Sequence, residues 1–156
     1  MSVRDVRLQD LSCKSSILEV CGWVEQAMDT LVLESAQRCN LNSTLLNRVK
    51  KNYIDKTFGL QYSKHFEKML IAVIGYRSYS VIEVDPIVAP YLPGFESLLS
   101  DLSKQRNHYA HTHYISQSPY PVGYSAIDAP SIMKSKVSTV ENILQIIETK
   151  LISCSC

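Results

Sequence analysis

One short segment of the chain concentrates the side chains that could carry out chemistry. Between Arg106 and His113, eight consecutive residues include one arginine, one asparagine and three of the four histidines. Histidine titrates near neutral pH and so transfers protons, whereas arginine stays charged and binds phosphate oxygens. The combination suits phosphoryl chemistry, of which attack of a ribose 2′-hydroxyl on the adjacent phosphate is one example. That reaction requires proton transfer and charge stabilisation but no metal and no cofactor.

The helical geometry expected for this segment separates its functional groups. At about 100° per residue, Asn107 and His111 share one face of a helix, and Arg106 and His113 lie on a neighbouring face. Arg106 and His111 diverge by about 140°, so the arginine side chain must reach around the helix. We therefore expect a homodimer, in which the same segment of a second copy completes the site across a two-fold axis.

Two other interpretations of the segment stay open. His108, His111 and His113 could supply three imidazole ligands to a zinc ion, although the last two point to different faces of a regular helix. The segment could also be a polar helix end whose histidines interact with the helix C-terminus and with water. A chelator distinguishes the first alternative, and histidine substitutions distinguish the second.

The rest of the sequence predicts the helices that must position this segment. Only five glycines and six prolines interrupt the chain, and apolar residues recur at steps of three and four. We expect an all-α bundle of about five helices in one domain over residues 1–156, with a central first helix. The helices are predicted over 13–38, 43–58, 62 to about 75, 94 to about 111, and 130–151. Residues 78–94 and 116–130 are predicted connections, with 80–84 a candidate short extended piece.

Composition favours a soluble cytoplasmic protein without a membrane partner. The longest apolar run is far shorter than the roughly 20 residues that span a bilayer, and the first residues lack the apolar stretch of a signal peptide. Five cysteines, an odd number with no C-x-x-C pair, are expected to be free thiols. The net charge of +1 gives no sign of a nucleic-acid partner, so any such evidence must be local.

Charge is segregated along the chain. Residues 41–68 contain six basic and two acidic residues, a net charge of +4, whereas residues 81–103 carry −4. Arg48, Lys50 and Lys51 lie together on the predicted second helix and are the candidate RNA contacts. A merely solvated helix face has the same pattern, and this alternative stays open.

The segment Arg106-Asn107-x-x-Ala110-His111, at the C-terminal end of the fourth predicted helix, resembles the R-x4-6-H motif of the HEPN superfamily. Members of that superfamily are small all-α domains and largely metal-independent RNases, with a catalytic groove at the dimer interface. The resemblance implies that Arg106 stabilises the phosphate, His111 transfers a proton and Asn107 orients one of them. His113 also satisfies the motif with a gap of six.

The resemblance also implies supporting residues and a biological setting. His108 and Tyr109 are supporting candidates within the motif, and an acidic residue of an early helix, Glu25 or Asp29, would orient the arginine or histidine. The implied function is a metal-independent endoribonuclease of a toxin or phage-defence system, with an antitoxin or a larger defence complex as a possible partner. The alternative is a catalytically inactive HEPN-like module that binds RNA or protein, or dimerises.

Overall fold

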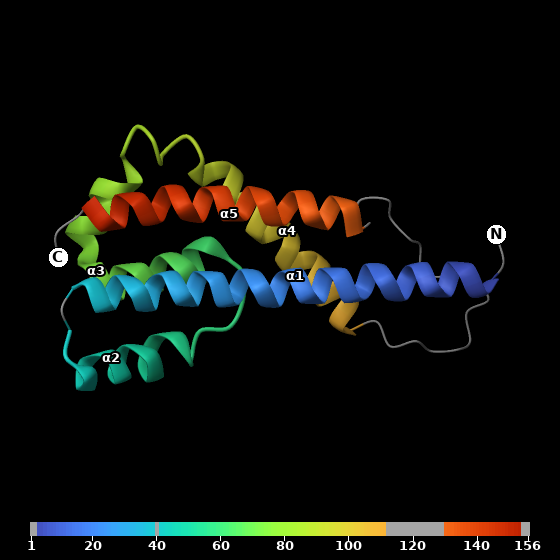
Figure 1. Ribbon diagram of the computed structural model, residues 1–156, viewed down its shortest axis with the longest axis horizontal. Coiled ribbons are helices and arrows are strands. Elements are labelled where there is room, and N and C mark those ends of the chain that lie inside the picture. The colour runs from blue at the N-terminus through green and yellow to red at the C-terminus, as the bar shows by residue number, and fades with distance from the viewer. Residues whose placement is uncertain (1–2, 40, 112–129, 154–156) are drawn as a thin grey trace.

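A computed structural model describes residues 3–39, 41–111 and 130–153 of the chain. These residues form helices and connecting turns without a strand, which confirms the predicted all-α class (Figure 1). Five α-helices and two π-helical turns follow one another: α1 (Val3–Arg38), α2 (Ser43–Val49), η1 (Lys50–Ile54), η2 (Tyr62–Phe66), α3 (Glu67–Glu83), α4 (Leu92–His111) and α5 (Pro130–Ser153). None of the helices in these residues is long and apolar enough to cross a membrane.

The first helix is the centre of the bundle, as its nearly all-round apolar surface predicts. It contacts α2, α3, α4 and α5. In Figure 1, α5 runs parallel to α1, α2 lies on the other side of α1 from α5, and α4 crosses α1 in the opposite direction. The buried residues of α1 include Ile17, Val24, Met28 and Val32, none more than 1% exposed. The other helices are therefore positioned against one common axis.

The first helix is longer than its apolar periodicity predicts. It begins at Val3, ten residues before the predicted start at 13. Neither glycine nor proline occurs before Gly22, and the polar residues of this stretch are compatible with a helix. The apolar repeat that starts at residue 13 therefore underestimates the length of this helix.

The third helix continues through the glycine at which it was predicted to end. Gly75 has φ 79° and ψ 159°, a conformation that favours glycine, and it produces a kink inside α3. Beyond the kink the chain stays helical to Glu83, so the predicted connection over 78–83, with its short extended piece, is wrong. Tyr79 and Ile82 are buried there, and the hydroxyls of Tyr79 and Tyr62 lie 3.2 Å apart in a hydrogen bond. Tertiary packing outweighs the strand preference of the β-branched residues.

The second predicted helix ends in a π-helical turn instead of continuing to residue 58. Val49 and Ile54 are both buried although they lie five residues apart, the spacing of a π turn. A regular α-helix would separate them by about 140°. The spacing of Leu45, Leu46, Val49, Tyr53 and Ile54 predicts one apolar face for this helix, but Tyr53 is 44% exposed and Leu45 is 39% exposed. The prediction was right for Val49 and Ile54 and wrong for these two residues.

An aromatic cluster anchors the start of α4. The ring of Tyr62 lies edge-to-face with Phe66 and with Phe95, each at a centroid distance of 5.8 Å. Phe95, Leu99 and Leu102 form the fully buried stripe of α4, which ends one turn before Arg106. The C-terminal end of α4, which carries the motif, therefore projects past the aromatic cluster that fixes its beginning.

Ion pairs hold the far end of the parallel α1–α5 pair. Arg38, in the last turn of α1, contacts Glu148 of α5 at 2.7 Å, and Lys150 of α5 contacts Asp85 in the connection before α4 at 3.0 Å. These contacts tie α1, α5 and the 84–91 connection together. The helix predicted over 130–151 is confirmed in position, since α5 begins at Pro130.

The cysteines differ from the expectation of five free thiols. Cys13 and Cys21 are buried in α1, where they pack as small apolar residues. Cys39, directly after α1, is disulfide-bonded, so the expectation is wrong at this position. Cys154 and Cys156 lie outside the described residues.

Candidate functional site

The arginine singled out by the sequence pairs with a carboxylate of the central helix. Arg106 Nη1 donates a hydrogen bond to Glu25 Oε1 at 2.6 Å. The two side chains keep 37% and 23% of their surface exposed, so solvent and a ligand can reach the pair. Of the two acidic residues that the resemblance suggested, it is Glu25 that is placed in contact with Arg106.

The directions of the two helices explain this contact. A helical side chain leans toward the N-terminus of its own helix. Because α4 runs against α1 (Figure 1), Arg106 leans toward higher residue numbers of α1 and reaches Glu25. The apolar stripe of α4 ends at Leu102, so the guanidinium meets its partner at the border of the core, where an ion pair is partly shielded from water.

A buried thiol lies next to this ion pair. Cys21, one turn before Glu25, donates its S–H to the carbonyl oxygen of Leu102 across a distance of 3.6 Å. Burial raises the pKa of Cys21 to about 11, the Arg106 charge lowers it, Glu25 raises it and Lys136 lowers it. The thiol is therefore protonated at neutral pH and serves as a hydrogen-bond donor that joins α1 to α4, not as a nucleophile.

A second cation, which the sequence did not single out, lies in the same neighbourhood. Lys136 of α5 donates a hydrogen bond to Gln105 Oε1 at 3.0 Å, and its charge acts on Cys21 together with that of Arg106. Three helices thus converge here and bring together the cations Arg106 and Lys136 and the carboxylate of Glu25. The sequence places Lys136 near the start of the last helix. That position does not indicate that α4 lies next to it.

The other residues of the motif lie in different surroundings. Asn107 and His108 are exposed, and the ring of His108 lies edge-to-face with Tyr109 at 5.2 Å. Tyr109 is partly buried against the core, a packing position. His111 is the last residue of α4; its side chain and the whole of His113 lie outside the described residues. Arg106, Asn107 and His108 are therefore placed, whereas the two candidate proton-transfer histidines are not.

Beyond the Arg106–Glu25 ion pair, the side chains of Asp29, Asp55 and His65 interact electrostatically with Glu25 or with one another. Burial, then the charges of Glu25 and Asp55, raise the pKa of Asp29 to about 6. Burial lowers the pKa of His65, which the Glu25 charge partly offsets. The backbone N–H of Gln61 donates to His65 Nδ1 at 3.0 Å, so the neutral ring carries its proton on Nε2. The charge of Glu25 therefore acts on two titratable groups outside the motif, Asp29 and His65.

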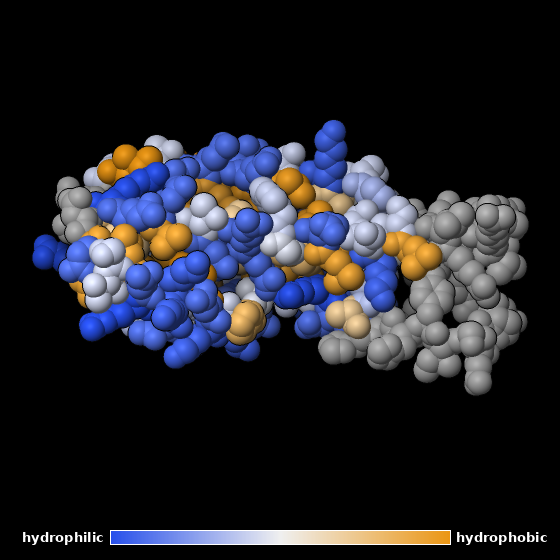
Figure 2. All heavy atoms as spheres, turned by 60° about the horizontal axis from the view of Figure 1, so that its bottom comes forward, coloured by the Kyte–Doolittle hydropathy of each residue, from blue (hydrophilic) through white to orange (hydrophobic). Residues whose placement is uncertain are grey.

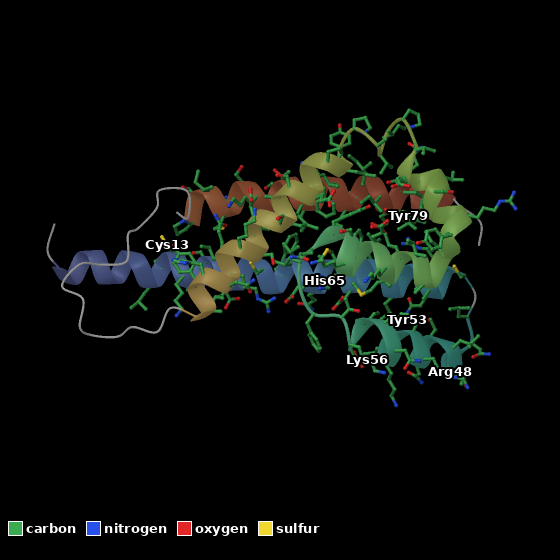
Figure 3. The ribbon with its side chains drawn as sticks, turned by 180° about the vertical axis from the view of Figure 1, so that it is seen from behind. Cys13, Arg48, Tyr53, Lys56, His65 and Tyr79 are labelled. Carbon is green, nitrogen blue, oxygen red and sulfur yellow. The ribbon has the colours of Figure 1, made fainter. Side chains whose placement is uncertain are left out.

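The fourth histidine has a structural part in this arrangement. Figure 3 shows His65 in the middle of the molecule. Its Cε1 atom lies only 2.6 Å from where a Cβ on Gly59 would be, and Gly59 has φ 125°. The ring closely approaches the backbone of the 55–61 loop and accepts a hydrogen bond at the start of η2. No neighbouring residue in the sequence marked His65 for this role.

The basic residues predicted to contact RNA are exposed on the α2 side of the molecule. Arg48, Lys50 and Lys51 belong to α2 and η1, and Lys56 lies in the turn that follows η1. Figure 3 shows Arg48 and Lys56 at the edge of the bundle away from α5. Figure 2, which turns this side forward, shows mostly hydrophilic side chains with separate apolar ones among them. The predicted residues are therefore accessible, and they lie apart from the α1–α4–α5 junction around Arg106.

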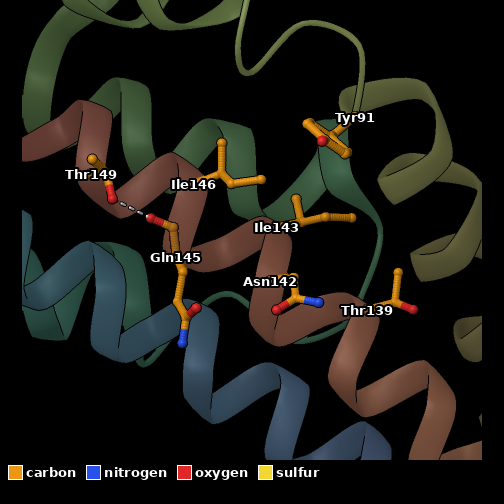
Figure 4. A pocket seen from close by; sticks show the side chains of 7 residues that line it. All are labelled: Tyr91, Thr139, Asn142, Ile143, Gln145, Ile146 and Thr149. Atoms are coloured by element: carbon orange, nitrogen blue, oxygen red, sulfur yellow. Dashed lines mark hydrogen bonds between the residues drawn. The ribbon is translucent and has the colours of Figure 1, made fainter.

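A pocket of about 580 Å³ lies between Tyr91 and α5 (Figure 4). Its lining from α5 includes Thr139, Asn142 and Ile146, and thus hydroxyl, amide and apolar groups. No carboxylate, imidazole or cationic side chain lines it. Among the described residues that line it, the pocket offers hydrogen-bonding groups but no cation to offset the charge of a phosphate, so the candidate phosphate chemistry is assigned to Arg106.

Metal ligation was the other chemical interpretation of the motif. Within the described residues, no group of three or more His, Cys, Asp and Glu side chains is placed to hold a metal ion. The three-histidine zinc alternative depends on His111 and His113, and the side chains of both lie outside the described part of the chain. It therefore stays an alternative, and a chelation experiment tests it.

Comparisons with protein-family models, with curated proteins and with solved structures find no match to this chain. The candidate site therefore stands on two kinds of observation. One is the geometry of Arg106, Glu25 and Lys136. The other is the similarity of the six residues from Arg106 to His111 to the HEPN motif.

Proposed function

We propose that this protein is a metal-independent endoribonuclease of the HEPN type. In this mechanism Arg106 stabilises the phosphate in the transition state, His111 transfers a proton and Asn107 orients the scissile phosphate or the imidazole. His113 or His108 assists. Glu25 positions Arg106 and does not itself contact the substrate.

One observation carries the proposal. Arg106 is not a solvated surface cation: its guanidinium is held by Glu25 at 2.6 Å, with Lys136 in the same neighbourhood. A guanidinium held in a defined direction is suited to a phosphate in the transition state, because its orientation need not be found during the reaction. The pair is also partly exposed, so a phosphate can compete with Glu25 for the arginine.

The proposed reaction balances without an external cofactor. The 2′-oxygen forms a bond to phosphorus while the bond from phosphorus to the 5′-oxygen breaks. A base removes the proton of the 2′-hydroxyl, and an acid delivers a proton to the 5′-oxygen. The products are a 2′,3′-cyclic phosphate and a 5′-hydroxyl, and Arg106 offsets the charge that develops on the non-bridging oxygens.

We further propose that two copies of the chain associate and that the protein acts in the cytoplasm as a toxin or defence effector. Two arrangements of the motif support the dimer: Arg106 and His111 diverge on one helix, and Asn107 and His108 are exposed at the end of α4. Light scattering at micromolar concentration is expected to show a dimer. A monomer would contradict the shared site.

The proposal is tested by cleavage of single-stranded RNA in EDTA. Cleavage is expected to persist and to leave a 2′,3′-cyclic phosphate. Arg106→Ala should lower kcat/KM by about 100-fold or more, on the scale of lost electrostatic stabilisation. Lys104→Ala is the matched control, since Lys104 lies two residues away, is exposed and pairs only with Asp101 of its own helix. Abolition by EDTA with rescue by zinc would favour the three-histidine metal site.

A variant in which the charges of Glu25 and Arg106 are exchanged distinguishes a catalytic role of Arg106 from a purely structural role of the ion pair. The double variant Glu25→Arg with Arg106→Glu keeps opposite charges on α1 and α4 but removes the cation from the motif. It is expected to restore thermal stability relative to Arg106→Ala without restoring cleavage. Recovery of cleavage in this double variant would show that the pair acts only through the fold.

The same ion pair favours one second function. With the Arg106 charge compensated by Glu25, the chain could be a HEPN-like module that binds RNA or protein without cleaving it. This alternative predicts that wild type and His111→Ala bind equally and that neither cleaves. Growth arrest on expression in bacteria, relieved by His111→Ala, would instead support the enzyme.

A further inference from the structure

A group of cations near α2 is concentrated in one short part of the chain and differs from Arg38, Lys104, Arg106 and Lys150 in its lack of ion pairs within the described residues. Arg38, Lys104, Arg106 and Lys150 each form an ion pair. Within the described residues, no ion pair involves the six basic side chains of residues 41–68, all of which are exposed: Arg48, Lys50, Lys51, Lys56, Lys64 and Lys68. Their charge is therefore available to an anionic partner.

Two aromatic rings stand among these cations with much of their surface in water. Phe58, two residues after Lys56, is 78% exposed, and Tyr53 is 44% exposed. The π turn of η1 contributes to this arrangement because it buries Ile54 and leaves Tyr53 outside. We call this stretch of α2, η1 and the loop after it, with its exposed side chains Arg48, Lys50, Lys51, Tyr53, Lys56 and Phe58, the basic-aromatic face.

The basic-aromatic face leads toward the candidate site. The 55–61 loop that carries Phe58 also contains Gly59, whose backbone closely approaches His65. α2 packs against α1 and η2 packs against α4, and these are the two helices that carry Glu25 and Arg106. A strand lying along α2 and η1 would therefore continue toward Arg106.

We propose that the basic-aromatic face binds single-stranded RNA through its phosphates, with an unpaired base stacked on Phe58, and that it delivers the strand to Arg106. This proposal rests on the proposed ribonuclease function. Cations with interspersed exposed aromatic rings bind single strands, because lysine and arginine contact the backbone and every base has a face that can stack. Paired bases in a duplex are not available to such rings, so single strands are the favoured class.

Binding is tested without cleavage by using 2′-O-methyl RNA of roughly 12 nucleotides, a length within the range that such surfaces cover. The blocked 2′-oxygen cannot attack, so the wild-type chain can be studied by fluorescence anisotropy. Phe58→Ala is expected to weaken binding by about 5- to 100-fold, and Phe58→Trp to retain it. Tyr76→Ala is the matched control: Tyr76 is 76% exposed, on α3, and its removal should leave the Kd unchanged.

The charges are tested by the dependence of binding on salt. Lys51→Gln with Lys56→Gln should reduce the slope of log K against log salt by about 1.4, because each lost single-strand phosphate contact removes about 0.7. Arg77→Gln with Lys134→Gln removes two exposed charges elsewhere and should leave the slope unchanged. An equal decrease of this slope in both double variants would overturn the proposal, since binding would then depend on net charge alone.

The outcomes separate this proposal from the proposed function. If Phe58→Ala weakens RNA binding but neither the wild type nor any variant cleaves RNA, the proposed binding face is supported and the proposed ribonuclease activity is contradicted. If wild type cleaves RNA and all face variants bind and cleave like wild type, the face is wrong and the ribonuclease stands. Binding to vesicles with phosphatidylserine, without binding to RNA, would overturn the proposal in favour of a membrane surface.

Discussion

The molecule holds its basic residues in two contrasting environments. At the α1–α4–α5 junction, Arg106 contacts Glu25 and Lys136 contacts Gln105, so each cation has a defined direction. On the basic-aromatic face, the cations are exposed and form no ion pair within the described residues. A fixed cation can stabilise charge at one position, whereas solvated cations attract a polyanion over a wider area.

The contrast explains why the net charge of +1 is uninformative. A charge that is compensated within the fold contributes little to the attraction of a distant partner, and an uncompensated group contributes its full share at low salt. The two regions should therefore respond differently to substitution. The predictions below use that difference, from the largest expected effect to the smallest.

The largest difference is expected in catalysis at the end of α4. His111→Ala should lower kcat/KM by about 100-fold or more, the scale of general acid–base catalysis, with little change in RNA affinity. His113→Ala should have a smaller effect. The cleavage rates of both variants under single-turnover conditions measure the two losses. A larger loss in His113→Ala would assign proton transfer to His113, the histidine that fits the motif with a gap of six.

The next largest effect is expected on stability, in the loop between η1 and η2. Gly59→Ala should lower the free energy of unfolding by about 1–3 kcal/mol, because Gly59 has φ 125° and the new Cβ would meet His65 at 2.6 Å. Gly22→Ala is the matched control in α1, because a Cβ added at Gly22 meets no other atom within 4 Å. It should stabilise the protein by about 0.5–1 kcal/mol. Urea denaturation measures both, and equal effects would contradict the close approach of His65.

A smaller effect is expected from Asp29, which lies between the two regions. Its pKa is raised to about 6 in the folded protein, so the folded state binds the proton more tightly than the unfolded state. Stability should therefore fall as pH rises from about 4 to about 6, and Asp29→Asn should remove this decrease. At pH 8 the variant should be more stable by about 1 kcal/mol, a value reduced from the full shift for partial exposure. Unfolding at pH 4 and pH 8 tests the sign, with Glu141→Gln as the exposed control.

The smallest effect is expected from the ion pair itself. Glu25→Gln should lower the free energy of unfolding by about 0.5–1 kcal/mol, because a partly exposed pair is screened by water. The difference should shrink in 1 M salt. A loss of about 3 kcal/mol or more, insensitive to salt, would show that the pair is part of the core and unavailable to a phosphate.

The sequence alone determined the fold class and the position of the chemically rich segment. Its apolar repeats identified the central α1 and placed α5 at Pro130, because those helices bury wide apolar faces. The density of charged and titratable residues around Arg106 was visible without a structure, since residue type needs no contact to be recognised. The positive charge of residues 41–68 was equally visible.

Only the tertiary structure decided which acid meets the arginine. Glu25 and Asp29 are one turn apart on the same helix, so periodicity cannot separate them; the crossing of α4 over α1 brings Arg106 to Glu25. Packing likewise buried Tyr79 and Ile82 in a helix where local preferences suggested a connection. A π turn buried Ile54 and left Tyr53 exposed. Each of these outcomes depends on partners distant in the sequence, which local propensity does not contain.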